Sequence, residues 1–249
     1  MARYGKLCAE FYDLDHPEAP PDALEFYREF ARRAVGPVLE PMCGSGRFLI
    51  PLLLEGFDVE GVDASAEMRA ACEERGRAVG VSPVVRCGSI EAFEPSRQFG
   101  LVFIPSGSFC LLTDEQTVKL SLQRIHSALL RGGTFVVEVE RVRRLPPQGT
   151  GVWNGRWVHR SDGAKIVLSV LSEYSGVQQM LRSVHRYDLV QEGKLLATEY
   201  EDFDLKLYEP GEFGDQLHAA GFTNIEAWRP YEPTTPGDED DAVVFSCTK

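Results

Sequence analysis

Val38-Leu39-Glu40-Pro41-Met42-Cys43-Gly44-Ser45-Gly46 carries the strongest indication of a fold in this chain. A short apolar run ends in a carboxylate and is followed by a turn with two glycines and by the helix-like segment 47–54. A second apolar run ends in Asp63, 23 residues after Glu40. Glycines in a strand-to-helix turn permit positive φ angles and the close approach of a ligand. The pattern therefore predicts a nucleotide-binding turn.

Two carboxylates define the expected ligand. In dinucleotide folds the helix after the turn binds a pyrophosphate, and a third glycine lets that helix pack on the strand. This chain has Leu49 at the third position. Glu40 would repel a phosphate and attract an ammonium or sulfonium group, whereas Asp63 occupies the position of an acid that binds ribose hydroxyls. A ribose with a cationic tail and no phosphate describes S-adenosylmethionine.

These residues resemble the class I S-adenosylmethionine-dependent methyltransferases, and the resemblance covers nearly the whole chain. Glu40 and the Gly44-Ser45-Gly46 turn match the family's first motif, with Met42 in place of its first glycine. That departure suggests a slightly altered approach of the methionine tail. After the third strand, family members often carry Gly-Asp, whereas this chain has Gly88-Ser89-Ile90. A hydroxyl or backbone groups should then recognise the adenine.

The cofactor contacts expected from this resemblance, together with those from the end of the fourth strand, involve twelve residues. They are Glu40, Cys43, Gly44, Gly46, Asp63, Ala64, Ser65, Met68, Ser89, Ile90, Pro105 and Ser106.

The remaining pattern alternates apolar strands with amphipathic helices, which is typical of a mostly parallel sheet. We expect helices at 21–35, 66–79 and 114–130, and further strands at 83–88, 99–105 and 133–140. A helix at 210–220 and strands at 223–229 and 242–248 resemble the family's C-terminal antiparallel hairpin. The expected fold is an α/β, doubly wound, Rossmann-like sheet of seven mostly parallel strands.

The pattern changes in segment 141–207. Long β-rich runs at 165–174, 179–190 and 195–207 are joined at Ser175-Gly176 and Glu192-Gly193, which favour two-residue hairpin turns. This predicts an antiparallel β-meander after the fifth strand, resembling insertions of small-molecule methyltransferases that include sugar N-methyltransferases. Two interpretations of this segment are equally favoured: a substrate cap, or a dimer surface or sheet extension. The expected parts are a lid and helix (1–36), a cofactor-binding core (37–140), the meander (141–207) and a C-terminal helix and hairpin (208–249).

Substrate and catalytic candidates lie at strand ends and near the N-terminus. Ligands of open α/β sheets bind beyond the carboxyl ends of the strands, where this chain presents Ser108, Phe109 and Glu140 as acceptor-binding candidates. Segment 4–16 resembles the lid of sugar N-methyltransferases, whose tyrosines lie against the cofactor. The resemblance implies catalytic roles for Tyr4 and Tyr12, and His16 is a further acceptor-binding candidate. We expect His126 to be structural. His185 could point into a cap or occupy a half-buried sheet position, and the alternation of the strand favours the second.

Methyl transfer from S-adenosylmethionine requires positioning, desolvation and at most the removal of one proton, because a methyl on sulfonium is already activated. We expect transfer to an N or O atom of a small molecule, with S-adenosylhomocysteine as product. An alternative is a lyase that cyclises the cofactor by attack at its own Cγ and releases methylthioadenosine. Glu40 and Leu49 disfavour an NAD-dependent oxidoreductase, and no positive sign indicates a non-catalytic cofactor sensor.

Composition limits the partners. The chain has 249 residues and a net charge of −12, which favours a small-molecule acceptor over nucleic acid. Its six cysteines form no C-x-x-C pair, and no His and carboxylate set has metal-ligand spacing, so we expect neither a metal nor disulfides. No signal-peptide pattern and no apolar run near about 18 residues occur. We expect a cytoplasmic protein without membrane contact, and the meander could form a homodimer surface.

Overall fold

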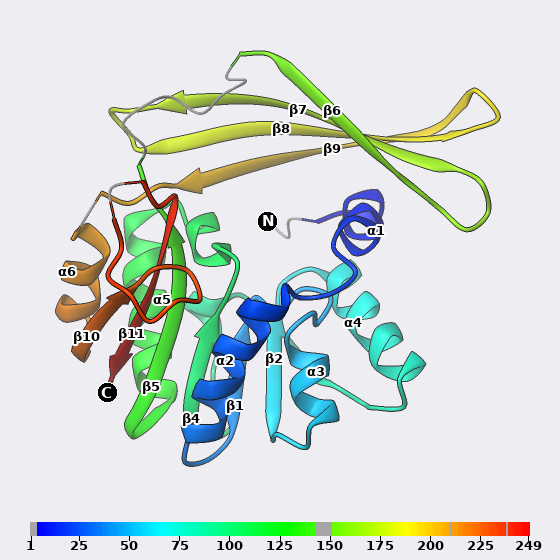
Figure 1. The fold of residues 1–249 in the computed structure, drawn as a ribbon. Coiled ribbons are helices and arrows are strands. Elements are labelled where there is room, and N and C mark those ends of the chain that lie inside the picture. Colours follow the sequence, from blue (N-terminus) through cyan, green and yellow to red (C-terminus); the bar gives the residue numbers. More distant parts are fainter. Residues whose placement is uncertain (1–3, 143–150, 210, 238) are drawn as a thin grey trace.

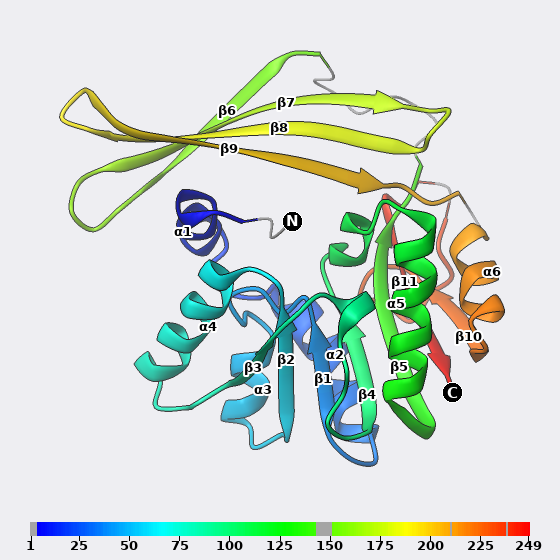
Figure 2. The same ribbon diagram turned by 180° about the vertical axis from the view of Figure 1, so that it is seen from behind.

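In a computed structural model the chain forms two separate sheets, one of seven strands and one of four. The structure describes residues 4–142, 151–209, 211–237 and 239–249. Figure 1 shows the larger sheet with helices on both faces and the smaller sheet crossing above its upper edge. Figure 2 shows the same arrangement from behind.

The larger sheet has the strand order β10-β11-β5-β4-β1-β2-β3. Its strands are β1 (Val38–Pro41), β2 (Val59–Asp63), β3 (Val84–Cys87), β4 (Phe99–Ile104), β5 (Leu129–Glu140), β10 (Thr223–Trp228) and β11 (Ala242–Thr248). The first five pair in parallel, and β11 is antiparallel to both β5 and β10. The predicted seven-stranded, mostly parallel sheet is confirmed.

Helices cover both faces of this sheet, as comparison of Figure 1 with Figure 2 shows. One face carries α2 (Pro21–Arg33), α3 (Leu49–Leu54) and α4 (Ala66–Ala78), and the other carries α5 (Glu115–Ala128) and α6 (Glu212–Ala219). On the first face the ring of Tyr27 lies 5.1 Å from that of Phe103. On the second, Phe213 lies 5.4 Å from Phe245. Two buried clusters thus fix the sheet between helix layers.

Two helices differ from the prediction at one of their ends. The helix expected at 114–130 ends at Ala128, because Leu129 already pairs with Phe99 as the first residue of β5. Gly132 lies inside this long strand, which begins earlier than the expected 133. The helix expected from Pro210 begins at Glu212, and Pro210 lies outside the described residues. So does Asp238, which belongs to the acidic segment 237–241 before the last strand.

The smaller sheet is an antiparallel meander inserted between β5 and α6, as predicted. It comprises β6 (Trp153–His159), β7 (Lys165–Ser175), β8 (Met180–Gln191) and β9 (Lys194–Lys206), of which β6 was not predicted. Glu192-Gly193 forms the expected two-residue turn, with φ angles of 51° and 74°. The predicted two-residue turn at Ser175-Gly176 is wrong, because Ser175 pairs with Met180 across a longer loop. The strands form a sheet of their own, so the meander is not a sheet extension.

A lid helix, α1 (Lys6–Asp15), lies between the meander and α4 (Figure 1). Its Phe11 ring lies 5.7 Å from the ring of Tyr187 on β8. Leu7, Phe11 and Tyr187 belong to a third buried cluster, which lid and meander form together. The meander therefore packs on the lid. No helix in the described ranges is long and apolar enough to cross a membrane.

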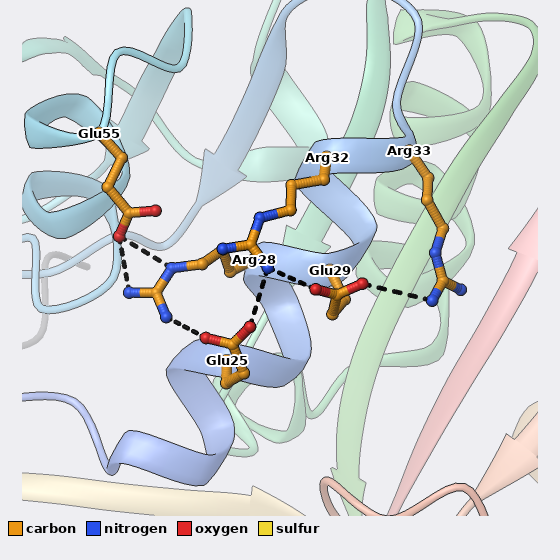
Figure 3. A network of polar contacts seen from close by, with 6 residues as sticks. All are labelled: Glu25, Arg28, Glu29, Arg32, Arg33 and Glu55. Carbon is orange, nitrogen blue, oxygen red and sulfur yellow. Dashed lines mark hydrogen bonds and ion pairs between the residues drawn. The ribbon is translucent and has the colours of Figure 1, made fainter.

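The outer side of α2 carries a row of alternating charges (Figure 3). Its members are Glu25, Arg28, Glu29, Arg32 and Arg33, and Glu55 joins them from the end of α3. Arg28 Nε lies 2.8 Å from Glu55 Oε1 and so connects the two helices. Exposed pairs of this kind contribute little to stability, because water and salt screen them. They keep this face hydrated while the buried clusters hold the sheet.

The close packing of α3 on β2 depends on Gly61. A Cβ at Gly61 would lie 2.6 Å from Cys43 Sγ and 2.7 Å from Leu49 Cδ1. Dinucleotide folds achieve this approach with a third glycine on the helix side of the turn. Here the helix carries Leu49, and the residue that lacks a side chain is Gly61 on the strand beneath it.

Gly61→Ala should therefore destabilise the chain by about 1–3 kcal/mol, since the extra methyl overpacks a filled core. Urea unfolding followed by circular dichroism measures the change. Gly214→Ala in α6 is the control, because a Cβ there meets Phe245 at an ordinary 3.8 Å. Equal free energies of unfolding for the two variants would contradict this account.

Candidate active site

A first cavity of about 570 Å³ lies at the carboxyl ends of β1, β2 and β4. Its volume suits a nucleoside-sized ligand. Eleven of the twelve predicted cofactor residues line it: Glu40, Cys43, Gly44, Asp63, Ala64, Ser65, Met68, Ser89, Ile90, Pro105 and Ser106. Both predicted catalytic residues of the lid, Tyr4 and Tyr12, line it as well.

Gly46 is the exception, because it lies beneath the turn and does not line the cavity. Its φ is 80°, and a Cβ would lie 2.6 Å from Cys72 Sγ and 3.0 Å from Ile50 Cγ1. Gly46 thus lets α4 and α3 approach the turn, which is a packing role. Met42 keeps the left-handed conformation that suits the family's first glycine, with a φ of 58°.

Asp63 joins the two loops that form the cavity. Its Oδ2 accepts a hydrogen bond of 2.8 Å from Gly44 N–H, and its Oδ1 accepts one of 2.8 Å from Ser65 N–H. Ser65 then caps α4 by accepting a bond of 3.1 Å from Met68 N–H. The carboxylate is anchored in a fixed orientation at the cavity wall.

Glu40 places an incompletely paired carboxylate in the same cavity. Its side chain is 2% exposed, and its Oε2 has no hydrogen-bond partner among the described residues. Burial raises the pKa of Glu40 well above its usual range, and the nearby Arg47 guanidinium opposes that rise. A buried, unsatisfied acceptor of this kind would be stabilised by a cationic ligand group.

Arg47 was not predicted, although it follows the glycine turn directly. It is 8% exposed, and its Nη2 donates a 3.3 Å hydrogen bond to Ser106 Oγ. Its guanidinium carbon lies 5.0 Å from the centroid of the Tyr12 ring. Burial also raises the pKa of the Tyr12 hydroxyl. The cavity therefore holds the Arg47 cation as well as Glu40, and a zwitterionic ligand tail would complement both.

A second cavity of about 410 Å³ lies between the lid, the ends of β4 and β5, and the inner face of the meander. Tyr4, Tyr12, Ser106, Ser108 and Leu111 line both cavities. The two cavities therefore meet at the lid tyrosines and the end of β4.

Three of the four predicted acceptor residues, His16, Ser108 and Glu140, line the second cavity. The fourth, Phe109, does not, because it lies in the short helix η2 (Ser108–Leu111) with its ring turned into the core. It is fully buried, 5.2 Å from the ring of Phe213. Phe109 is therefore a packing residue.

Glu140 is the carboxylate of the second cavity. It has no hydrogen-bond or ion-pair partner for its side chain within the described ranges. Burial, Glu138 and Asp241 all raise the pKa of Glu140. A Cβ at Gly107 would lie 3.2 Å from its Oε1, so glycine leaves room for the carboxylate. The local charge favours a cationic or proton-donating group.

The meander supplies polar residues that the sequence did not place in a site. The Tyr187 hydroxyl lies 3.2 Å from Cys8 Sγ and 3.3 Å from His185 Nδ1. Burial lowers the pKa of His185 to about 4, so its imidazole is neutral at neutral pH. Of the two orientations expected for His185, the structure shows the less favoured one, because this residue lines the cavity. His126 packs against Phe222 at 5.1 Å, consistent with a structural role.

Arg156, Ser172, Ser183, Phe203 and Leu205 also line the second cavity without having been predicted. Alternation along β8 and β9 assigns residues to one face, yet which face is inward depends on where the meander folds back. Within the described ranges no group of three or more His, Cys, Asp or Glu side chains is placed to hold a metal.

Comparison with known proteins agrees with this geometry. Residues 38–133 match the family described as "Methyltransferase domain". A Geobacillus sp. (strain WCH70) protein that carries the name "Putative methyltransferase" is 25% identical over 252 residues, covering 97% of this chain and 98% of that protein.

Two solved structures share the fold over nearly the whole chain. A S-adenosylmethionine-dependent methyltransferase from Clostridium acetobutylicum ATCC 824 superposes with a TM-score of 0.80 at 17% identity, covering 96% of each chain. The sugar N-methyltransferase KedS8 from Streptoalloteichus sp ATCC 53650 superposes with a TM-score of 0.76 at 22% identity, covering 100% of this chain and 96% of that one. The likeness includes the meander as well as the core sheet.

Glu40→Gln should stabilise the ligand-free protein by about 1 kcal/mol or more at pH 8, since it removes a buried and poorly paired charge. The folded state raises the pKa of Glu40, and this determines how stability changes with pH. The contribution of Glu40 to stability is fully present below its ordinary pKa of 4.5 and is lost as pH rises through its pKa in the folded state. The same variant should bind S-adenosylmethionine at least about tenfold more weakly.

Urea unfolding at pH 5 and pH 8, with calorimetric titration of the cofactor, measures both effects. Glu55→Gln, at the outer end of α3, is the matched control. A Glu40→Gln variant that is less stable at pH 8 and binds the cofactor normally would overturn this assignment.

Proposed function

Residues 38–133 are a methyltransferase domain in a chain with the class I methyltransferase fold throughout, and from this premise we propose an S-adenosylmethionine-dependent N-methyltransferase. The first cavity binds the cofactor, and the second binds a small-molecule acceptor with an amino group. The observation that carries the proposal is the meeting of the two cavities at Tyr4 and Tyr12, with Glu140 on the acceptor side.

On the cofactor side, Asp63 faces the ribose hydroxyls, because its carboxylate is held at the wall by Gly44 and Ser65. Glu40 pairs with the ammonium of the methionine tail, and Arg47 pairs with its carboxylate. When bound, S-adenosylmethionine supplies a methyl group activated by sulfonium. These contacts convert the buried charge of Glu40 from a cost into a binding contribution.

On the acceptor side, Glu140 attracts an amine and takes up the proton that the nitrogen must lose to become nucleophilic. Its raised pKa matches this role, because a carboxyl with a higher pKa is a better proton acceptor. The neutral imidazole of His185 and the Ser172 and Ser183 hydroxyls can bind further polar groups of the acceptor. The likeness to a sugar N-methyltransferase supports a polyhydroxylated amine.

The meander acts as the cap of the acceptor site. Its inner face supplies Ser183, His185 and Tyr187 from β8 and Phe203 from β9. With α1 it excludes water from the reacting atoms, which strengthens the electrostatic contacts there. Positioning and desolvation are the main contributions that methyl transfer from a sulfonium requires.

We also propose a homodimer through the outer face of the meander. Trp153, Trp157 and Tyr200 are 52%, 59% and 60% exposed. Trp153 and Trp157 pair with Leu171 and Val167 of β7, so these side chains share the face opposite the cavity. Large exposed aromatic residues of this kind mark interfaces.

The six free cysteines, five of them buried, support the cytoplasmic location that we propose.

Acceptor dependence should distinguish methyl transfer from cyclisation. With labelled S-adenosylmethionine and a panel of amino sugars, simple amines, phenols and carboxylates, S-adenosylhomocysteine should form only when an amine is present. Glu140→Gln should lower kcat/KM for the amine about tenfold to a hundredfold, through loss of a charge-assisted hydrogen bond, and should leave S-adenosylhomocysteine affinity unchanged. Glu226→Gln on β10 is the control. Enzyme-dependent methylthioadenosine without acceptor would refute the methyltransferase assignment.

The dimer makes a separate prediction. Light scattering should give twice the chain mass of 27.8 kDa at micromolar concentration. Trp157→Lys should shift the protein toward monomer, because a charge replaces an apolar contact in the interface. Val177→Lys, in the β7–β8 loop, should not. A wild-type protein that is monomeric under these conditions would rule out this interface.

A further inference from the structure

We infer that Glu199 and Glu201 of β9 are positioning residues that hold the lid tyrosines over the reaction site. The inference rests on the proposed function, since it concerns how Tyr4 and Tyr12 reach the two cavities. It adds a pair of residues that line neither cavity and belong to the cap.

The N-terminus of α1 is bound by these two remote carboxylates. Gly5 N–H donates a 2.6 Å hydrogen bond to Glu201 Oε1. Leu7 N–H and Cys8 N–H donate bonds of 3.1 Å each to the Oε2 and Oε1 atoms of Glu199. The first amides of a helix lack partners within the helix, and negative charge is favoured at that end. The N-cap residue of α1, Gly5, has no side chain to cap the helix itself.

Glycine at position 5 permits this arrangement. A Cβ there would lie 2.5 Å from Glu199 Oε1 and 2.9 Å from Glu201 Oε1. The φ of Gly5 is −71°, which any residue can adopt. Close approach of the carboxylates, and not backbone conformation, therefore requires glycine here.

The anchored end of the lid is fixed to the cofactor site as well. The carbonyl of Tyr4 accepts a 3.0 Å hydrogen bond from Ser65 Oγ, and Ser65 caps α4 beside Asp63. The Tyr4 ring lies 5.1 Å from Phe203 of β9 and 6.2 Å from the Tyr12 ring. Tyr4 is thereby fixed between the cap strand and the cofactor helix.

The contacts of Glu199 and Glu201 with α1, together with that of Ser65 with Tyr4, therefore fix the distance between the cap and the loop after β2. Glu199 pairs across the sheet with Tyr187, whose hydroxyl contacts Cys8 of the lid and lines the acceptor cavity. Loss of the carboxylate anchor would free the start of α1, and Tyr4 and Tyr12 with it. Misplacement of the reacting groups by about 1 Å can slow catalysis by about 100-fold.

Hydrogen exchange and steady-state kinetics of the 249-residue chain test the inference. In Glu199→Gln, amide exchange in segment 6–15 should accelerate about tenfold or more, while exchange in α5 and β5 stays unchanged. The kcat should fall about tenfold, with S-adenosylhomocysteine affinity changed by less than about threefold. Gly5→Ala should act in the same way, because it displaces both carboxylates without changing their charge. Glu192→Gln, in the β8–β9 turn, is the matched control and should change neither readout.

Two results would overturn the inference. One is unchanged exchange in segment 6–15, with unchanged kcat, in both Glu199→Gln and Gly5→Ala. The other is a uniform acceleration of exchange over the whole chain, which would indicate a merely structural role. If the wild-type chain itself fails to bind S-adenosylhomocysteine, the proposed function fails instead, so the two failures are distinguishable.

Discussion

The site depends on one carboxylate, Asp63, that binds the backbone of two loops at once. By accepting bonds from Gly44 and Ser65 it fixes the glycine turn after β1 against the loop after β2. Ser65 extends this connection in two directions, to the first turn of α4 and to the carbonyl of Tyr4 in the lid. The shape of the first cavity and the attachment of Tyr4 to it thus follow from the end of a single strand, whose approach to α3 is permitted by Gly61.

Charge in the two cavities is arranged for ligands and not for the stability of the empty protein. Glu40 and Glu140 are largely removed from solvent, and burial raises the pKa of each. Arg47 compensates Glu40 only in part. Active sites commonly retain such unfavourable groups because a bound ligand offsets their cost. In the proposed reaction the two carboxylates face different partners, the methionine tail and the acceptor amine.

The sequence alone predicted those features of the fold and the site that a short local pattern encodes. The glycine turn, the paired acids and the alternation of strands and helices all appear within short windows, and the seven-stranded sheet follows from them. Phe109 was misplaced because a strand-end position does not say which way a following 3-10 turn directs its side chain. Contacts such as Glu199 with Leu7 join residues 192 apart, and no local pattern signals them. The roles of Arg47 and His185 likewise depend on tertiary packing.

The central claim is that Asp63 and the glycine turn form an S-adenosylmethionine site. Calorimetric titration of the wild-type chain and of Asp63→Asn with S-adenosylmethionine, and of the wild type with NAD, tests it most directly. Asparagine keeps an acceptor for Gly44 N–H but loses the charge that faces the ribose and the acceptor for Ser65 N–H. The account predicts roughly micromolar binding of S-adenosylmethionine, about tenfold to a hundredfold weaker binding in the variant, and no binding of NAD. Equal affinity of both proteins for S-adenosylmethionine, or NAD binding that displaces it, would contradict the account.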